Sequence, residues 1–212
     1  MHQPEKKPST PPYLIRTERL VIRCWDPRDA GLLREAIDSS LEHIRPWMFW
    51  TKREPQPLAE TVERLRQFRA KFDLDESFVY GVFSADESEV IGGTSLGRIA
   101  ADEAFVIGYW IRESRIRQGF ATEVTAALTR VAFELCGVDR VEIHVMPSNP
   151  ASRKIPPKLG YVEEATLRRR LRDGDGELQD GIVFTMLAEE FPASPCAAVP
   201  IEAYGAAGER VL

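Results

Sequence analysis

The sequence contains little that would indicate a secreted, membrane-embedded or metal-binding protein. Only three cysteines occur among its 212 residues, Cys24, Cys136 and Cys196. Their odd number and wide spacing suit neither a disulfide framework nor a metal cluster. No apolar run approaches the ~18 residues that indicate a membrane span, and the N-terminus lacks the charged-then-apolar pattern of a secretory signal. We therefore expect a cytoplasmic protein with no metal and no membrane contact.

Two nucleotide-binding motifs are also absent. No Gly-Lys-Ser/Thr follows a glycine-rich loop, so there is no Walker motif, and the glycine triplet of a dinucleotide fingerprint is missing. The net charge of −5 argues against general nucleic-acid binding. The basic run at residues 168–172 is more typical of a solvated strand edge than of a ligand site. An acidic protein would instead favour a cationic acceptor such as an amine.

The length fits one domain, and the hydrophobic periodicity predicts an α/β fold with helices packed on a mixed sheet, in the order β-α-α-β-β-β-α-β-α-β-β. Residues 1–12 are proline-rich and predict a flexible arm, and residues 13–191 predict the domain itself. The Ala/Pro/Gly-rich tail, residues 192–212, has no convincing pattern. We therefore expect the core to stay folded without residues 193–212.

Local signals place the elements. Asp26 followed by Pro27 is a good helix start, and Pro57 opens a second helix. Asn149 and Pro150 begin a short helix that Pro156 should break. The predicted strands are residues 14–25, 78–84, 90–99, 104–111, 140–146, 161–170 and 182–190.

The most informative stretch runs from the apolar strand ending at Ile111, through three arginines and Gly119, into a periodic helix. A helix N-terminus presents backbone N–H groups without intrahelical partners, and the helix dipole adds positive potential there. Gly119 allows close backbone approach, and Arg115 and Arg117 add charge. These features predict that residues 117–122 bind a phosphate-bearing ligand.

The element order and a series of loose motifs resemble the GCN5-related N-acetyltransferase (GNAT) superfamily, and within it the RimJ/RimL-like branch. The resemblance covers roughly residues 14–190. The motifs that carry it are Thr17-Glu18-Arg19-Leu20, Arg45-Pro46-Trp47-Met48, Gly108-Tyr109-Trp110-Ile111, Gln118-Gly119-Phe120-Ala121-Thr122-Glu123, and Asn149 through Ser152 to Lys158-Leu159-Gly160-Tyr161. The family's pyrophosphate loop, Gln/Arg-x-x-Gly-x-Gly/Ala, is matched at Gly119 and Ala121 but has Ile116 at its first position.

The resemblance implies acetyl-CoA as co-substrate and gives roles to particular residues. The backbone of Trp110, Ile111 and Arg112 would pair with the pantetheine arm, and Asn149 would bind near the thiol. The diphosphate would be held by Arg117, Gln118, Gly119, Phe120, Ala121 and Thr122. Many relatives have a tyrosine seven residues after the asparagine as the acid for the thiolate. This chain has Pro156 there, which leaves Ser152 as the candidate acid or as an ordinary first-turn residue.

Other candidates are less specific. Glu142 is the candidate general base because it lies on the strand before Asn149, although a surface carboxylate paired with an arginine is the more common case. His144 shares its face, and Glu163 and Glu164 are further possibilities. Trp47 and Trp50 would line the acceptor channel or close the end of the core.

The expected activity is direct transfer of an acetyl group to a primary amine, foremost a protein N-terminal α-amine of the ribosomal-protein type. A small-molecule amine, such as an antibiotic or toxin, is an alternative acceptor. The departures at Ile116 and Pro156 also leave open a non-catalytic acyl-CoA-binding module. By analogy with the family we expect a homodimer.

Overall fold

The computed structural model describes residues 10–99 and 103–212. Most of the predicted N-terminal arm, residues 1–9, lies outside this description. Its last residues pack against the domain, because Pro11 and Pro12 are buried. The Tyr80 hydroxyl donates a hydrogen bond to the Pro12 carbonyl oxygen (3.0 Å). No helix in the described residues is both long and apolar enough to cross a bilayer.

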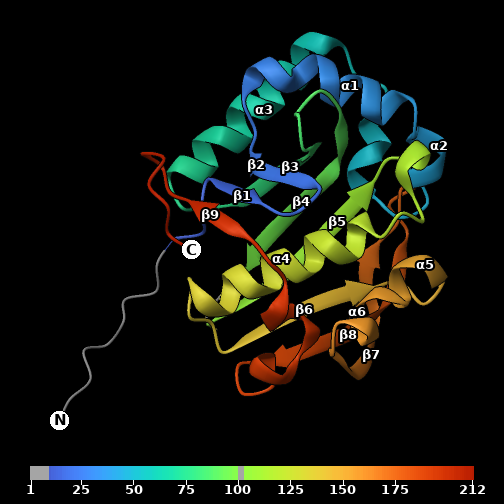
Figure 1. The fold of residues 1–212 in the computed structure, drawn as a ribbon. Helices are drawn as coiled ribbons and strands as arrows, with labels where there is room; N and C mark the ends of the chain where they lie inside the picture. Colours follow the sequence, from blue (N-terminus) through green and yellow to red (C-terminus); the bar gives the residue numbers. More distant parts are fainter. Residues whose placement is uncertain (1–9, 100–102) are drawn as a thin grey trace.

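A single mixed sheet organises the fold (Figure 1), as expected for an α/β domain. Its spatial order is β7-β8-β6-β5-β4-β3-β2-β1-β9. Within residues 10–99 and 103–212 its nine strands are β1 (Leu14–Arg16), β2 (Leu20–Cys24), β3 (Phe78–Ser84), β4 (Val90–Arg98), β5 (Ala104–Ile111), β6 (Arg140–Val145), β7 (Val162–Arg172), β8 (Leu178–Leu187) and β9 (Glu202–Tyr204). Neighbouring strands are antiparallel except β5 and β6, which run parallel. This exception positions the candidate active site.

Helices cover both faces of the sheet. The α-helices are α1 (Ala30–Asp38), α2 (Leu41–Ile44), α3 (Leu58–Asp73), α4 (Phe120–Glu134), α5 (Pro150–Arg153) and α6 (Ile155–Lys158), and 3₁₀ turns occupy Pro27–Asp29, Phe49–Arg53, Glu113–Arg115, Phe191–Ala193 and Pro195–Ala198. Helix α4 packs its apolar face, including Val124, Leu128 and Val131, into the larger core cluster. Helices α1 and α3 contribute Leu33 and Leu65 to a second cluster. Helix α3 also contributes Phe72 to the larger cluster, so it packs against both.

Most of the predicted elements are present. Asp26 caps the first helical turn, with its carboxylate accepting a hydrogen bond from the Arg28 N–H (2.8 Å). The segment after Asn149 is divided into α5 and α6, because the prolines at 156 and 157 cannot donate helical hydrogen bonds. The single strand expected at residues 14–25 is wrong. The chain folds there into the β1–β2 hairpin, and the Thr17 hydroxyl accepts a hydrogen bond from the Leu20 N–H at the turn (3.0 Å).

The C-terminal segment is structured, contrary to its sequence-based description as a tail without a pattern. Strand β9 pairs with β1 and extends the sheet. Cys196 and Ala203 are fully buried, and Ile201 is nearly so. The Arg130 guanidinium on α4 also donates to the Val199 carbonyl oxygen (2.7 Å). A three-residue strand is too short for an alternation pattern to be recognised, and its stability comes from contacts distant in sequence.

Candidate active site

The two parallel strands separate from each other at the centre of the sheet. Residues 104–106 of β5 pair with residues 140–142 of β6, and the pairing ends there. Strand β5 nevertheless continues to Ile111, and β6 continues to Val145. A cavity of about 1480 Å³ extends along this gap. The carboxyl ends of parallel strands are a common place for a ligand in an α/β sheet.

The hydrogen-bonding register determines which backbone groups of β5 face this gap. The Arg112 N–H donates to the carbonyl oxygen of Ile91 in β4 (2.9 Å). At the other end of the strand pair, the Ile99 N–H donates to the Ala104 carbonyl oxygen (3.0 Å). Because hydrogen-bonding direction alternates along a strand, even-numbered residues of β5 bond to β4. The N–H and C=O groups of Tyr109 and Ile111 then point toward the gap.

This register changes part of the expectation for the pantetheine contacts. Trp110 lies opposite Gly93 of β4, and the alternation directs its backbone polar groups toward β4. Arg112 uses its N–H within the sheet. Ile111 is thus the member of the expected trio whose backbone faces the cavity, and Tyr109 joins it.

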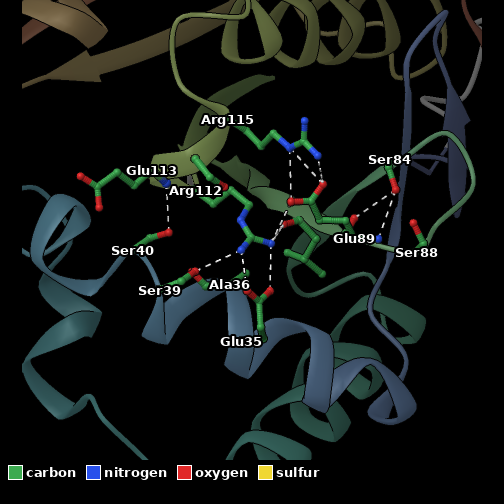
Figure 2. A network of polar contacts seen from close by, with 12 residues as sticks. Glu35, Ala36, Ser39, Ser40, Ser84, Ser88, Glu89, Arg112, Glu113 and Arg115 are labelled. Carbon is green, nitrogen blue, oxygen red and sulfur yellow. Dashed lines mark hydrogen bonds and ion pairs between the residues drawn. The ribbon is translucent and has the colours of Figure 1, made fainter.

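Arg112 instead has a structural role through its side chain, which is only 7% exposed. Figure 2 shows its guanidinium between two carboxylates, Glu35 of α1 (2.6 Å) and Glu89 beside β4 (3.1 Å). Glu89 also binds Arg115 (2.7 Å). The Ser40 hydroxyl accepts a hydrogen bond from the Glu113 N–H (3.0 Å). This network fixes the segment before the predicted phosphate loop against α1.

The predicted phosphate loop has the backbone conformation of an anion site. Gly119 has φ +85°, immediately before α4, and Arg117 has φ +61°, which is uncommon for a residue with a side chain. Left-handed residues near a helix N-terminus can turn backbone N–H groups toward one point, and the α4 dipole adds positive potential there. Of the expected loop residues, all but Gln118 line the cavity: Arg117, Gly119, Phe120, Ala121 and Thr122.

Residues of the turn between β1 and β2 contact this loop and stabilise it. The Arg19 guanidinium donates to the Gln118 carbonyl oxygen (3.0 Å) and binds the Glu123 carboxylate (2.7 Å). It also stacks over the Phe120 ring, 4.5 Å from the centroid. Thr17 donates to Glu123 as well (2.6 Å). The Thr17–Leu20 motif therefore supports the loop by side-chain contacts.

Two hydroxyl groups, one from β5 and one from α5, are in hydrogen-bond contact in the cavity. The Tyr109 hydroxyl lies 2.9 Å from the Ser152 hydroxyl, and both residues line the cavity. Asn149 positions Ser152 because its side-chain oxygen accepts a hydrogen bond from the Ser152 N–H (3.0 Å). Burial raises the pKa of Tyr109 to about 12, although the Ser152 contact partly offsets that rise. Sequence reasoning missed Tyr109, for which the only signal was a hydroxyl in an otherwise apolar strand.

The expected base, Glu142, lies beside the cavity rather than in its wall. Its carboxylate accepts a hydrogen bond from Arg140 (2.8 Å) and contacts His144 Nε2 (2.7 Å). Burial raises the pKa of Glu142, but these two hydrogen bonds outweigh burial and lower it overall. His144 lines the cavity, whereas Glu142 does not. The geometry therefore suits a histidine facing the ligand with a carboxylate behind it.

Of the remaining candidate residues, the two tryptophans line the cavity and the two glutamates do not. Trp47 and Trp50 line the same cavity as the phosphate loop, and the Trp50 ring packs 5.9 Å from that of Trp110. Glu163 and Glu164 do not line it. Glu163 lies 3.7 Å from Arg153, and Glu164 accepts a hydrogen bond from Thr185 (3.0 Å). Among the described residues no cluster of metal-ligating side chains is present.

Comparison with known proteins identifies the family. Residues 19–162 match the family model described as an acetyltransferase (GNAT) domain. The chain belongs to the GNAT acetyltransferase family. It is 23% identical over 185 residues to the [ribosomal protein uS5]-alanine N-acetyltransferase of Escherichia coli, covering 86% of this chain and 95% of that protein. It is 29% identical over 113 residues to the probable N-acetyltransferase YjcK of Bacillus subtilis, covering 52% of this chain but only 62% of that relative.

Solved structures agree with this family. Mycobacterium smegmatis RimJ, solved in complex with CoA-disulfide, superposes with a TM-score of 0.74 at 25% identity, covering 86% of this chain and 90% of the other. The GNAT acetyltransferase described here is thus an N-acetyltransferase with the expected mixed α/β domain. A CoA ligand is present in this neighbour, which is consistent with acetyl-CoA as the co-substrate.

Proposed function

We propose that this GNAT acetyltransferase transfers the acetyl group of acetyl-CoA to the α-amino group of a polypeptide N-terminus. The observation that carries the proposal is a single cavity that joins the phosphate loop at Gly119, the hydroxyl pair Tyr109–Ser152, and the aromatic residues Trp47 and Trp50. A CoA arm starting at the loop would run along the backbone of Tyr109 and Ile111. Its thioester would then lie between the hydroxyl pair and the aromatic end.

The residues fit the donor by the chemistry they present. The N–H groups of residues 117–122 suit a diphosphate, because the left-handed residues and the helix dipole both favour an anion. The N–H groups on the cavity side of β5 suit the amide oxygens of pantetheine and the thioester oxygen. Asn149 uses its side-chain oxygen for capping, which leaves its amide NH₂ as the group that a ligand would meet.

Transfer requires the amine nitrogen to form a bond to the thioester carbon while the carbon–sulfur bond breaks. His144 accepts the proton that the amine loses, and Glu142 orients the imidazole and stabilises its charge. A β5 N–H stabilises the negative charge on the carbonyl oxygen. Ser152 passes a proton to the departing thiolate and takes another from solvent, with Tyr109 holding the serine hydroxyl in place. A thiol with a pKa near 8.5 is a fair leaving group, so this last proton contributes less than the correct placement of the amine.

The acceptor class is supported by the relatives and by the shape of the site. The relative from E. coli is named as an N-acetyltransferase of a ribosomal protein's alanine. Trp50 of the 3₁₀ turn Phe49–Arg53 and Leu171 and Arg172 of β7 line the same cavity, so a polypeptide whose first residue occupied it would lie beside these elements.

The test is incubation of the protein with acetyl-CoA and matched peptides whose N-terminus is free or blocked, with the acetyl position determined by mass spectrometry. Acetylation of the α-amine alone is expected. Acetylation of small amines but of no peptide would favour the small-molecule alternative. Acetyl-CoA binding without acetylation of any amine would favour a binding module.

A further inference from the structure

Strand β7 contains a large bulge between Leu167 and Leu171 that the proposed acetyl transfer does not use. Leu167 pairs with Gly181 of β8, and Leu171 pairs with Gln179. Three arginines of β7, Arg168, Arg169 and Arg170, therefore face the single residue between those partners. Bulges redirect side chains at the edge of a sheet and are often found beside active sites.

The backbone at the bulge is fixed in an uncommon conformation. Arg169 has φ +53°, a left-handed value that non-glycine residues rarely adopt. Its N–H donates to the Asp180 carboxylate (2.9 Å), which holds the bulge in place. The three arginine side chains are exposed to solvent. The fold thus presents them outward from a defined backbone.

The positive charge of the bulge is not neutralised by ion pairs. In the parts of the chain that the structure describes, no carboxylate forms an ion pair with Arg168, Arg169 or Arg170. Two carboxylates of the same hairpin are used for other contacts. Asp180 accepts the Arg169 N–H, and Asp173 accepts hydrogen bonds from Gln179 (2.7 Å) and from two N–H groups of the turn. The protein has a net charge of −5, whereas this bulge carries three adjacent positive charges without ion-pair partners among the described residues.

The arginine bulge is continuous with the active-site cavity. The next two residues of β7, Leu171 and Arg172, line the cavity. The turn of the hairpin is held against the aromatic end, because Lys52 donates to the Asp175 carbonyl oxygen (3.0 Å). A polypeptide whose first residue occupies the cavity would pass the bulge on leaving it.

We propose that Arg168, Arg169 and Arg170 bind acidic side chains of the acceptor polypeptide that follow its N-terminal residue. This inference rests on the proposed function and specifies its substrate class as acidic N-terminal segments. An acidic peptide is favoured over nucleic acid as the occupant because the bulge directly precedes Leu171 and Arg172, which line the cavity that the proposed function assigns to a polypeptide N-terminus.

The experiment compares kcat/KM for peptides that carry a pair of glutamates, moved stepwise along the chain, with peptides that carry glutamines at the same positions. The variant R168Q/R170Q retains Arg169 and its backbone geometry. The control R66Q/K71Q removes the same charge from the exposed surface of α3. Wild type and the control should prefer the acidic peptide about fourfold at low salt, since each of the two glutamates forms an exposed ion pair that contributes roughly a factor of two. Added salt should weaken the preference.

The variant R168Q/R170Q should lose this preference while its kcat/KM for the glutamine peptide and its affinity for CoA stay unchanged. Equal kcat/KM for both peptides in the wild type, or loss of the preference in the control, would overturn the inference. If no peptide is acetylated, the proposed function fails, and fluorescence anisotropy with a labelled acidic peptide decides the inference separately. Binding that R168Q/R170Q abolishes supports it, whereas no binding, equal binding, or tighter binding of a single-stranded RNA overturns it.

Discussion

The Tyr109 hydroxyl on β5 lies 2.9 Å from the Ser152 hydroxyl on α5, across the gap between the two parallel strands. The contact joins residues that are 43 positions apart in sequence. It gives Ser152 a partner that restricts the direction of its hydroxyl. The same serine is the candidate acid in the proposed mechanism.

Removal of the serine hydroxyl tests its chemical role. Ser152→Ala should lower kcat about a hundredfold, at the lower end of the range for general acid catalysis because the thiolate is a fair leaving group. Its affinity for acetyl-CoA in titration calorimetry should stay within a factor of two of the wild type. Ser152→Thr, which keeps a hydroxyl, is the control and should recover part of the activity. Unchanged turnover of the alanine variant would remove Ser152 from the mechanism.

Tyr109→Phe keeps the ring and removes only the hydroxyl. Because burial raises the Tyr109 pKa to about 12, the hydroxyl keeps its proton over the ordinary assay range and acts through its hydrogen bond. We expect kcat to fall about tenfold, the value of one lost hydrogen bond. In a double-mutant cycle, Tyr109→Phe should add little to Ser152→Ala. Fully additive losses would show that the two hydroxyls act independently.

Substitution at Gly119 tests the phosphate loop. Gly119→Asp would place a carboxylate beside the diphosphate and force a side chain into a left-handed conformation. The Kd for acetyl-CoA should rise about a hundredfold or more, since like charges near 4 Å repel by roughly 4 kcal/mol near a protein surface. Gly137→Asp is the matched control, because Gly137 also has positive φ (+64°) but lies at the other end of α4 with open space around it. Equal affinities of the two variants would contradict the loop assignment.

The Glu142 carboxylate predicts a pH-dependent contribution to stability. Burial opposes the charged form, but hydrogen bonds from Arg140 and His144 lower its pKa in the folded state below the unfolded value. The contribution is therefore present above the unfolded pKa, about 4.3, and is lost as pH falls below it. Urea unfolding should show wild type more stable than Glu142→Gln at pH 7, with the difference shrinking below about pH 4.3. A difference that stayed constant would contradict the assigned hydrogen bonds.

The C-terminal segment predicts a large effect of truncation. Removal of residues 193–212 would expose the surfaces that Cys196, Ile201 and Ala203 bury and would uncover the edge of β1. Burial of the Ile201 side chain alone contributes about 1.5–3 kcal/mol, and the smaller buried side chains and the β1–β9 pairing add to it. We therefore expect the melting temperature to fall by about 10 °C or more. Ile201→Ala keeps the chain length and should cost about 2 kcal/mol. A truncated protein with the wild-type melting temperature would restore the description of this segment as a tail.

Features that depend on residues close in sequence could be predicted from the sequence, whereas contacts between distant residues could not. The capping at Asp26, the break at Pro156 and the glycine before α4 depend on neighbouring residues, and all three could be predicted. Tyr109–Ser152 and Arg112–Glu35 join residues that are 43 and 77 positions apart. Such contacts depend on the arrangement of the strands, which periodicity alone does not determine. Which residues of β5 direct their N–H and C=O groups toward the cavity depends on the pairing register with β4. The sequence alone therefore could not distinguish Trp110 and Arg112 from Tyr109 and Ile111 as contacts of the pantetheine.

The most direct test of the account is a crystal structure of the protein with CoA. We expect N–H groups of residues 117–122 to bind the diphosphate oxygens, the pantetheine to pair with Tyr109 and Ile111, and the sulfur to lie near the Ser152 hydroxyl. A CoA molecule bound away from Gly119, or one whose sulfur points away from the gap between β5 and β6, would contradict it.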